Sequence, residues 1–113
     1  MHELSLACQM VELIESAAQT EGFHRARVVH LEVGRLSCVE PQALAMAFEA
    51  ASQGTCAEGA ELALHAIDAE GACTACGHLQ ALETLYDECQ SCGQLPLKVL
   101  SGTELRVRDL EVE

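Results

Sequence analysis

Residues 73–93 read CTACGHLQALETLYDECQSCG and contain two Cys-x-x-Cys pairs, Cys73 with Cys76 and Cys89 with Cys92. Two residues between paired cysteines allow both sulfurs to reach one ion. A glycine directly after each pair lets the backbone curl so that its N–H groups face the thiolates. Two such turns predict a closed site of four sulfurs, which is typical of a structural metal ion rather than a catalytic one. Zinc is the metal that we expect.

Three other interpretations of these cysteines compete with zinc. The spacing can arise by chance, one pair can be a redox motif, or the four sulfurs can hold iron as in rubredoxin. A redox motif needs only one cysteine pair, so the second pair would have no role. Iron is harder to distinguish from zinc, because it suits the same arrangement of four sulfurs. Residues 70–101 contain few large apolar side chains, so we expect removal of the metal to unfold this module.

The segments on either side of the module predict two helices and three strands. Polar residues recur every three or four positions along 4–20, which predicts an amphipathic helix that stops at Gly22. Glu40 and Pro41 predict the start of a second helix, because proline suits the first helical position and a carboxylate suits the positive end of the helix dipole. Alternating apolar residues predict three strands, over 26–34, 61–69 and 103–112.

The order of these segments predicts an α+β fold: two helices packed on a three-stranded sheet, with a small four-cysteine zinc-ribbon-like module inserted before the last strand. We expect residues 1–69 and 102–113 to form the core and residues 70–101 to form the module. Along the last strand the apolar alternation changes phase, which predicts a bulge near Asp109.

The composition narrows the classes of partner and the compartment. The chain has six Lys and Arg and eighteen Asp and Glu, which gives a net charge of −12. Nucleic acid and membrane surfaces are therefore poor partners, and basic proteins or cations are better ones.

The sequence has neither an apolar run long enough to cross a membrane nor a signal peptide, so we expect a cytoplasmic protein. In that reducing compartment, seven cysteines favour metal binding over disulfides. We expect the remaining three to be buried or half-buried: Cys8, Cys38 and Cys56.

The N-terminal residues Met1, His2 and Glu3 suggest a second metal site. The α-amine, the His2 backbone nitrogen and an imidazole nitrogen can form adjacent chelate rings in one plane, which suits Ni(II) or Cu(II). Such binding should weaken as the pH falls through about 8 to 6.5, where the amine and the imidazole become protonated. The alternative is that these residues simply fray.

Four further histidines carry weaker signals. We expect a solvated or hydrogen-bonded side chain for His24, His30 and His65 rather than a metal ligand. His78 follows Cys76 by two residues, so it can face a partner or couple its protonation to the module.

Taken together, the start MHELSLACQMVELIE, the segment VHLEVGRLSCVEPQALAMAFE (29–49) and the two Cys-x-x-Cys pairs resemble the HypA/HybF family. These proteins are nickel metallochaperones for [NiFe]-hydrogenase maturation. The resemblance covers essentially the whole chain and implies the same α+β core with an inserted zinc module.

The resemblance also implies sites and partners. Nickel would bind through Met1 and His2 with Glu3 close by, and the four module cysteines would bind zinc. Some members use an acidic residue near position 40, where this chain has Glu40. The implied partners are a HypB-type GTPase and the large subunit of [NiFe]-hydrogenase, and some relatives also serve urease.

Two hypotheses therefore stand. The first is a non-enzymatic nickel carrier, a monomer or weak homodimer, with permanent zinc and transient nickel. The second is a zinc-ribbon adaptor that binds a protein and carries no second metal. The sequence gives little support for an enzyme. It shows no recognisable Ser-His-Asp or Cys-His arrangement and no phosphate-binding loop.

Overall fold

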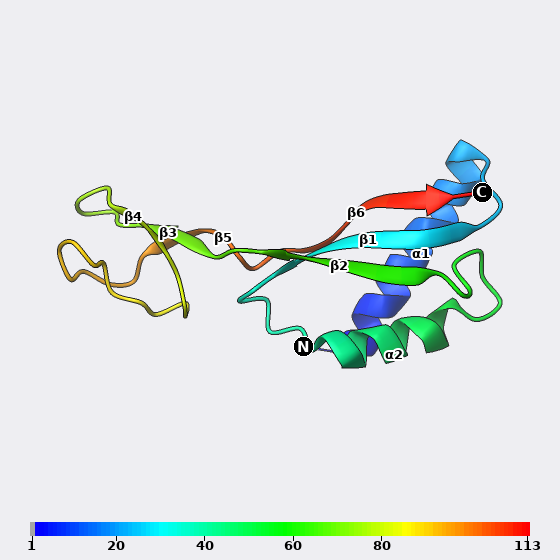
Figure 1. Cartoon of the computed structure of the whole chain (residues 1–113), viewed down its shortest axis with the longest axis horizontal. Helices are drawn as coiled ribbons and strands as arrows, with labels where there is room; N and C mark the ends of the chain where they lie inside the picture. The colour runs from blue at the N-terminus through cyan, green and yellow to red at the C-terminus, as the bar shows by residue number, and fades with distance from the viewer. Residues whose placement is uncertain (1) are drawn as a thin grey trace. The chain divides into compact units, whose positions relative to one another are not determined.

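The computed structural model describes residues 2–113 and contains two helices and two sheets of three strands each (Figure 1). The elements follow in the order α1 (Glu3–Glu21), β1 (Ala26–Gly34), α2 (Pro41–Ser52), β2 (Glu61–Ile67), β3 (Glu70–Ala72), β4 (Leu79–Ala81), β5 (Lys98–Ser101) and β6 (Leu105–Val112). The α+β class, with the cysteine-rich region inserted before the last strand, is confirmed.

Contacts within the chain divide it into two compact units. The helical unit comprises Met1–Leu31, Val39–Leu64 and Val107–Glu113. The cysteine unit comprises Glu32–Cys38 and His65–Arg106. Strands β1, β2 and β6 contribute residues to both units.

Helix α1 turns one narrow stripe toward the core of the helical unit. Its buried residues repeat at intervals of three, one and three: Ala7, Met10, Val11 and Ile14. Leu4 and Leu13 lie off this stripe and are exposed. The helix ends at Gly22 as predicted, because this residue adopts the left-handed conformation (φ 79°) and donates its N–H to the Ala18 carbonyl at 2.8 Å.

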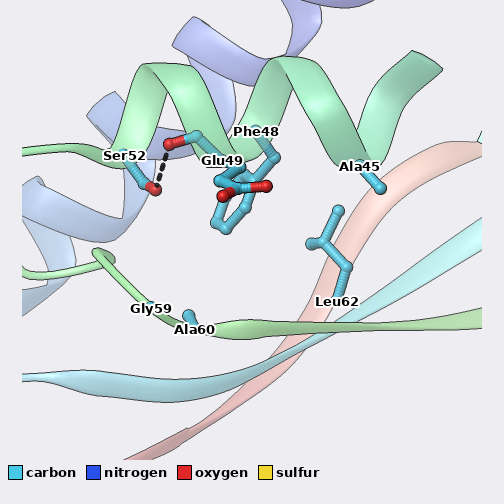
Figure 2. A pocket seen from close by; sticks show the side chains of 7 residues that line it. All are labelled: Ala45, Phe48, Glu49, Ser52, Gly59, Ala60 and Leu62. Carbon is cyan, nitrogen blue, oxygen red and sulfur yellow. Dashed lines mark hydrogen bonds between the residues drawn. The ribbon is translucent and has the colours of Figure 1, made fainter. Parts of the chain in front are cut away.

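Helix α2 begins at Pro41 and is capped by the side chain of Glu40. It packs with α1 and buries Leu44 and Phe48. Beside it, a shallow pocket of about 360 Å³ has Phe48 and Leu62 among its apolar lining groups and Glu49 as its ionisable one (Figure 2).

The first sheet has the order β2-β1-β6. The Arg25 N–H donates to the Glu113 carbonyl at 3.1 Å and the Gly34 N–H donates to the Glu104 carbonyl at 2.7 Å, so β1 and β6 run antiparallel. Strands β1 and β2 end together, where the Arg35 N–H donates to the Ile67 carbonyl at 3.0 Å. They are therefore parallel, with α2 as their crossover connection.

The burial pattern of β6 agrees with the predicted change of phase. Its sheltered residues are Leu105, Val107 and Leu110, so the alternation shifts between Val107 and Leu110. The predicted strand 61–69 is too long, because β2 ends at Ile67. Asp68 leaves the strand, pairs with Arg35 at 2.5 Å and accepts a hydrogen bond from Ser101 at its carbonyl.

The second sheet, of order β4-β3-β5, was not predicted. Strand β3 lies in the middle and runs antiparallel to β4, with Gly71 opposite Gln80. It also runs antiparallel to β5, with Gly71 opposite Val99. The Leu82 side chain covers Gly71 so closely that an added Cβ would lie 3.0 Å from both of its methyl carbons.

Segments of the cysteine unit also cross at two glycines. A Cβ added to Gly34 would lie 2.1 Å from the Gly102 carbonyl oxygen, and one added to Gly102 would lie 2.4 Å from the Cβ of Ala69. Only glycine permits backbones to approach this closely. The Leu36 N–H donates to the Gly102 carbonyl at 2.7 Å, so the crossing is also hydrogen-bonded.

Candidate metal centres

The first cysteine pair lies on a tight turn that connects β3 to β4. The Cys73 N–H donates to the His78 carbonyl at 2.9 Å, and the Gly77 N–H donates to the Cys73 carbonyl at 2.9 Å. Gly77 has a φ of 78°, which an L side chain rarely adopts. We call this turn, Cys73 to His78, the first knuckle.

The second cysteine pair forms a turn with the same bonds. The Cys89 N–H donates to the Gln94 carbonyl at 2.8 Å, and the Gly93 N–H donates to the Cys89 carbonyl at 2.8 Å. Gly93 has a φ of 77°, matching Gly77. This second knuckle, Cys89 to Gln94, therefore repeats the first at the matching positions.

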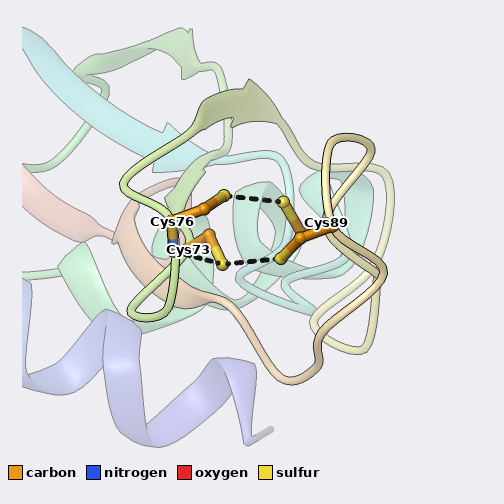
Figure 3. Close-up of side chains that lie close together, drawn as sticks. Cys73, Cys76 and Cys89 are labelled. Atoms are coloured by element: carbon orange, nitrogen blue, oxygen red, sulfur yellow. Dashed lines mark hydrogen bonds between the residues drawn. The ribbon is translucent and has the colours of Figure 1, made fainter.

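The two knuckles bring all four sulfurs together, each within 4.8 Å of the others (Figure 3). The Cys73 and Cys92 sulfurs lie 3.5 Å apart, and those of Cys76 and Cys89 lie 3.7 Å apart. A tetrahedral zinc ion with Zn–S bonds of about 2.3 Å would space its sulfurs by about 3.8 Å. The donor set therefore fits zinc. Over residues 2–113 this is the one group of three or more His, Cys, Asp or Glu side chains close enough to share an ion.

Backbone N–H groups favour the thiolate form at this site. The Cys76 N–H, 3.4 Å from the Cys73 sulfur, contributes most to lowering the pKa of Cys73 to about 6. Burial raises the pKa of Cys89, but the N–H groups that follow it lower that pKa overall. The Gln94 N–H acts to lower the pKa of Cys92, yet the neighbouring sulfurs raise it to about 12. Four thiolates this close together require a cation.

Each knuckle places one sulfur inside the unit and one at its surface. Cys73 and Cys89 are buried, whereas Cys76 and Cys92 are exposed. The buried pair forms a small apolar cluster with Ala69, Leu82 and Leu97. The cluster is small, so the sulfurs form a substantial part of this unit's core.

Of the residues expected to bind nickel, His2 and Glu3 lie at the start of α1. Met1 falls outside the described residues. His2 is the N-cap residue and is exposed, its carbonyl accepts from the Leu6 N–H at 3.2 Å, and its side chain makes no capping hydrogen bond. Glu3 is half-buried in the first turn of the helix.

The carboxylate of Glu40 binds backbone N–H groups at the start of α2. One carboxylate oxygen accepts from the Gln42 N–H at 3.2 Å and the other from the Ala43 N–H at 2.6 Å. The acidic side chain therefore satisfies two N–H groups at the positive end of α2, as its place before Pro41 predicts.

The remaining histidines and cysteines are mostly distributed as expected. His30 bonds to Glu111 at 2.7 Å, which agrees with a hydrogen-bonded histidine. Cys56 is half-buried as expected, but the prediction of burial is wrong for Cys8 and Cys38, which are exposed. Cys8 lies three residues after Ser5 on the polar stripe of α1, and this spacing was a sign of its exposure.

Comparison with known proteins places these features in a family. A family model described as "Hydrogenase/urease nickel incorporation, metallochaperone, hypA" matches residues 1–112. The chain belongs to the HypA family. Hydrogenase maturation factors HypA from Dechloromonas aromatica and Chlorobaculum tepidum are 41% and 42% identical to it over 113 residues, which is the full length of all three chains.

A HypA structure has the same fold. The solution structure of the Ni metallochaperone HypA from Helicobacter pylori matches with a TM-score of 0.75 and 25% identity, and the match covers 99% of this chain and 97% of that one. The chain is thus a nickel-incorporation metallochaperone of hydrogenase maturation and not an enzyme. Among residues 2–113, neither helix combines the length and the apolar character that a membrane crossing needs.

Proposed function

We propose that this HypA-family chain binds Ni(II) at its N-terminus and releases it to a partner, while a zinc ion stays in the four-cysteine site. The nickel ligands are the Met1 α-amine and the nitrogens of His2, with Glu3 close by. Three nitrogens in a plane suit Ni(II) and leave a fourth position for another ligand. Glu40 is outside this set because both its oxygens bind backbone N–H groups.

One observation carries the nickel proposal: the residue next to the α-amine is an exposed histidine whose side chain makes no capping bond to α1. Its imidazole is therefore available to a metal ion beside the amine. The match of the family model supports the handling of nickel by this chain, because the family is described as one of nickel incorporation.

The zinc proposal rests on the geometry of the cysteines. Two matched knuckles provide four sulfurs and no open position, which suits a metal that is retained. We propose that residues 70–101 act as the zinc module and that residues 1–69 with 102–113 act as the nickel-handling core.

The partners follow from family and charge. We propose a HypB-type GTPase as the nickel donor or co-chaperone and the large subunit of [NiFe]-hydrogenase as the recipient, in the cytoplasm. A net charge of −12 suits docking onto basic surfaces and disfavours tight self-association, so the chain acts as a monomer or weak homodimer. Nickel delivery to urease is a further role, suggested by the description of the family.

The test uses untagged protein and isothermal titration calorimetry with Ni(II). One added residue before Met1 moves the α-amine away, and His2→Ala removes the imidazole. Each change should abolish nickel binding and leave one zinc per chain. His24→Ala is the matched control, since His24 is another exposed histidine of the helical unit.

Unchanged nickel affinity in the extended variant would contradict the N-terminal site. A wild-type chain that holds one zinc and takes up no nickel would instead favour the alternative, a zinc-ribbon adaptor.

A further inference from the structure

Gln80 is a buried polar side chain beside the cysteine site. It is 9% exposed and lies on β4, directly after the first knuckle. Its side-chain nitrogen donates to the Glu88 carbonyl at 3.0 Å, and its side-chain oxygen accepts from the Gln90 N–H at 2.8 Å. A neutral amide has both a donor and an acceptor, so one side chain satisfies both backbone groups.

The two partners of Gln80 flank a metal ligand. Glu88 and Gln90 are the residues on either side of Cys89, whose sulfur lies 3.7 Å from that of Cys76. The backbone of Gln80 is itself fixed, because it pairs with Gly71 in the second sheet. Gln80 therefore joins the second knuckle to the strand that carries the first, through bonds that do not involve the metal.

We propose that Gln80 is a positioning residue that sets the arrangement of the two knuckles, so that the four-cysteine site retains zinc and refuses nickel. This inference rests on the proposed function, in which zinc is resident and Ni(II) is cargo. Thiolates bind both metals, so the site must discriminate by geometry.

The discrimination follows from the shapes that the two ions prefer. Zinc accepts a tetrahedron of sulfurs, whereas Ni(II) favours four ligands in a plane. Moving the sulfurs into a plane requires the second knuckle to turn relative to the first. That rotation would pull the backbone beside Cys89 away from the Gln80 amide. It would leave four polar groups unpaired: the nitrogen and oxygen of the buried Gln80 amide, the Glu88 carbonyl and the Gln90 N–H.

The test compares wild type with Gln80→Leu, which removes both bonds, and Gln80→Glu, which keeps only the acceptor. Gln90→Ala is the matched control, because the side chain of Gln90 is exposed and only its backbone bonds to Gln80. Zinc-loaded full-length proteins are mixed with excess 4-(2-pyridylazo)resorcinol at neutral pH, and the rate of zinc transfer is followed by absorbance. Each protein is also incubated with excess Ni(II), and the absorption band of nickel–thiolate bonds is recorded.

Loss of the outer partners of metal ligands typically lowers metal affinity about 10- to 100-fold. We therefore expect zinc to leave Gln80→Leu faster than wild type by a factor of about the same size. Gln80→Glu should fall between the two, and Gln90→Ala should match wild type. The nickel–thiolate band should develop in Gln80→Leu and be absent from wild type. Nickel held at the N-terminus gives no such band, because its ligands there are nitrogens.

Three results would overturn the proposal. Rates of zinc release from both Gln80 variants within twofold of the wild-type rate would contradict the proposal. Faster release without a nickel–thiolate band, and with an unchanged ligand-field spectrum after Co(II) substitution, would make Gln80 a structural support only. A wild-type chain isolated without zinc would refute the zinc assignment itself, and this is established before any variant is compared. If Gln80→Leu does not fold, Gln80→Glu, which keeps the side-chain volume, decides the matter.

Discussion

The four-cysteine site and the proposed nickel site differ in how much of the fold forms each of them. At the cysteine site, two knuckles with matching hydrogen bonds supply four sulfurs, and two of these sulfurs lie in the core of the unit. At the proposed nickel site, the fold supplies one helix terminus and an exposed histidine. A metal that organises its surroundings is hard to remove, whereas one bound at a chain end can leave without unfolding anything.

In the proposed function, this difference corresponds to retention of zinc and transfer of nickel. A closed tetrahedral site offers no vacant position at which an incoming ligand can attack the ion. Three nitrogens in a plane leave one position free, and a recipient protein can use it to begin exchange. In the proposed function, the two sites thus separate a metal that stabilises the chain from a metal that the chain carries.

The largest effect should come from breaking the cysteine site. Cys73→Ser removes a buried sulfur from the cluster of Ala69, Leu82 and Leu97. Structural zinc contributes about 10–16 kcal/mol of apparent folding free energy in small zinc domains. We expect loss of bound zinc, measured by elemental analysis, and loss of amide protection in the cysteine unit, measured by hydrogen exchange.

The same variant should affect the amide protection of the cysteine unit but not that of the helical unit. In Cys73→Ser, the amides of α1 and α2 should stay protected, since the core of the helical unit contains none of the four cysteines. Cys38→Ser, an exposed cysteine outside the knuckles, is the matched control and should keep its zinc. Equal loss of protection in both units would show that the zinc ion supports the whole chain.

A smaller but still large effect is expected at the glycine crossing of the cysteine unit. Gly34→Ala would place a Cβ 2.1 Å from the Gly102 carbonyl oxygen, so the backbone must shift. We expect a loss of unfolding free energy of about 3 kcal/mol or more, measured by urea denaturation of zinc-loaded protein. A wild-type stability for this variant would mean that the metal alone determines the fold of this unit.

Gly22→Ala is the corresponding control in the helical unit. Gly22 also has a positive φ, 79°, but a Cβ added there would meet nothing within 4 Å. Its cost is therefore that of the left-handed backbone conformation alone, about 1 kcal/mol. The difference between the two variants measures the steric part of the crossing.

The sequence predicts features that depend on neighbouring residues. The spacing of the cysteines and the glycines after them indicates both knuckles, because each knuckle is formed within six residues. The periodicity of α1 and the Glu40-Pro41 start of α2 are local in the same sense, and the structure has both helices.

The sequence does not predict features whose partners meet only after folding. Strands β3, β4 and β5 have three or four residues each and pair across the cysteine knuckles, so no alternation marks them. The sequence also does not predict the role of Gln80, because its hydrogen-bond partners are backbone groups eight and ten positions away. For Cys38 the apolar character of cysteine was misleading, since the residue is exposed in the loop between β1 and α2, where it has a positive φ of 62°.

The smallest effect is expected at Glu40, and it tests whether this residue caps α2 or also binds nickel. Glu40→Ala removes two hydrogen bonds at the start of α2 and should lower the unfolding free energy by about 1 kcal/mol, as loss of other N-caps does. Glu49→Ala, an exposed carboxylate on the same helix, should be close to neutral. In calorimetry, nickel affinity should stay within about twofold of wild type, a change of less than about 0.5 kcal/mol. A tenfold loss of affinity in Glu40→Ala, absent from Glu49→Ala, would instead make Glu40 a nickel ligand and extend the transfer site from one helix terminus to two.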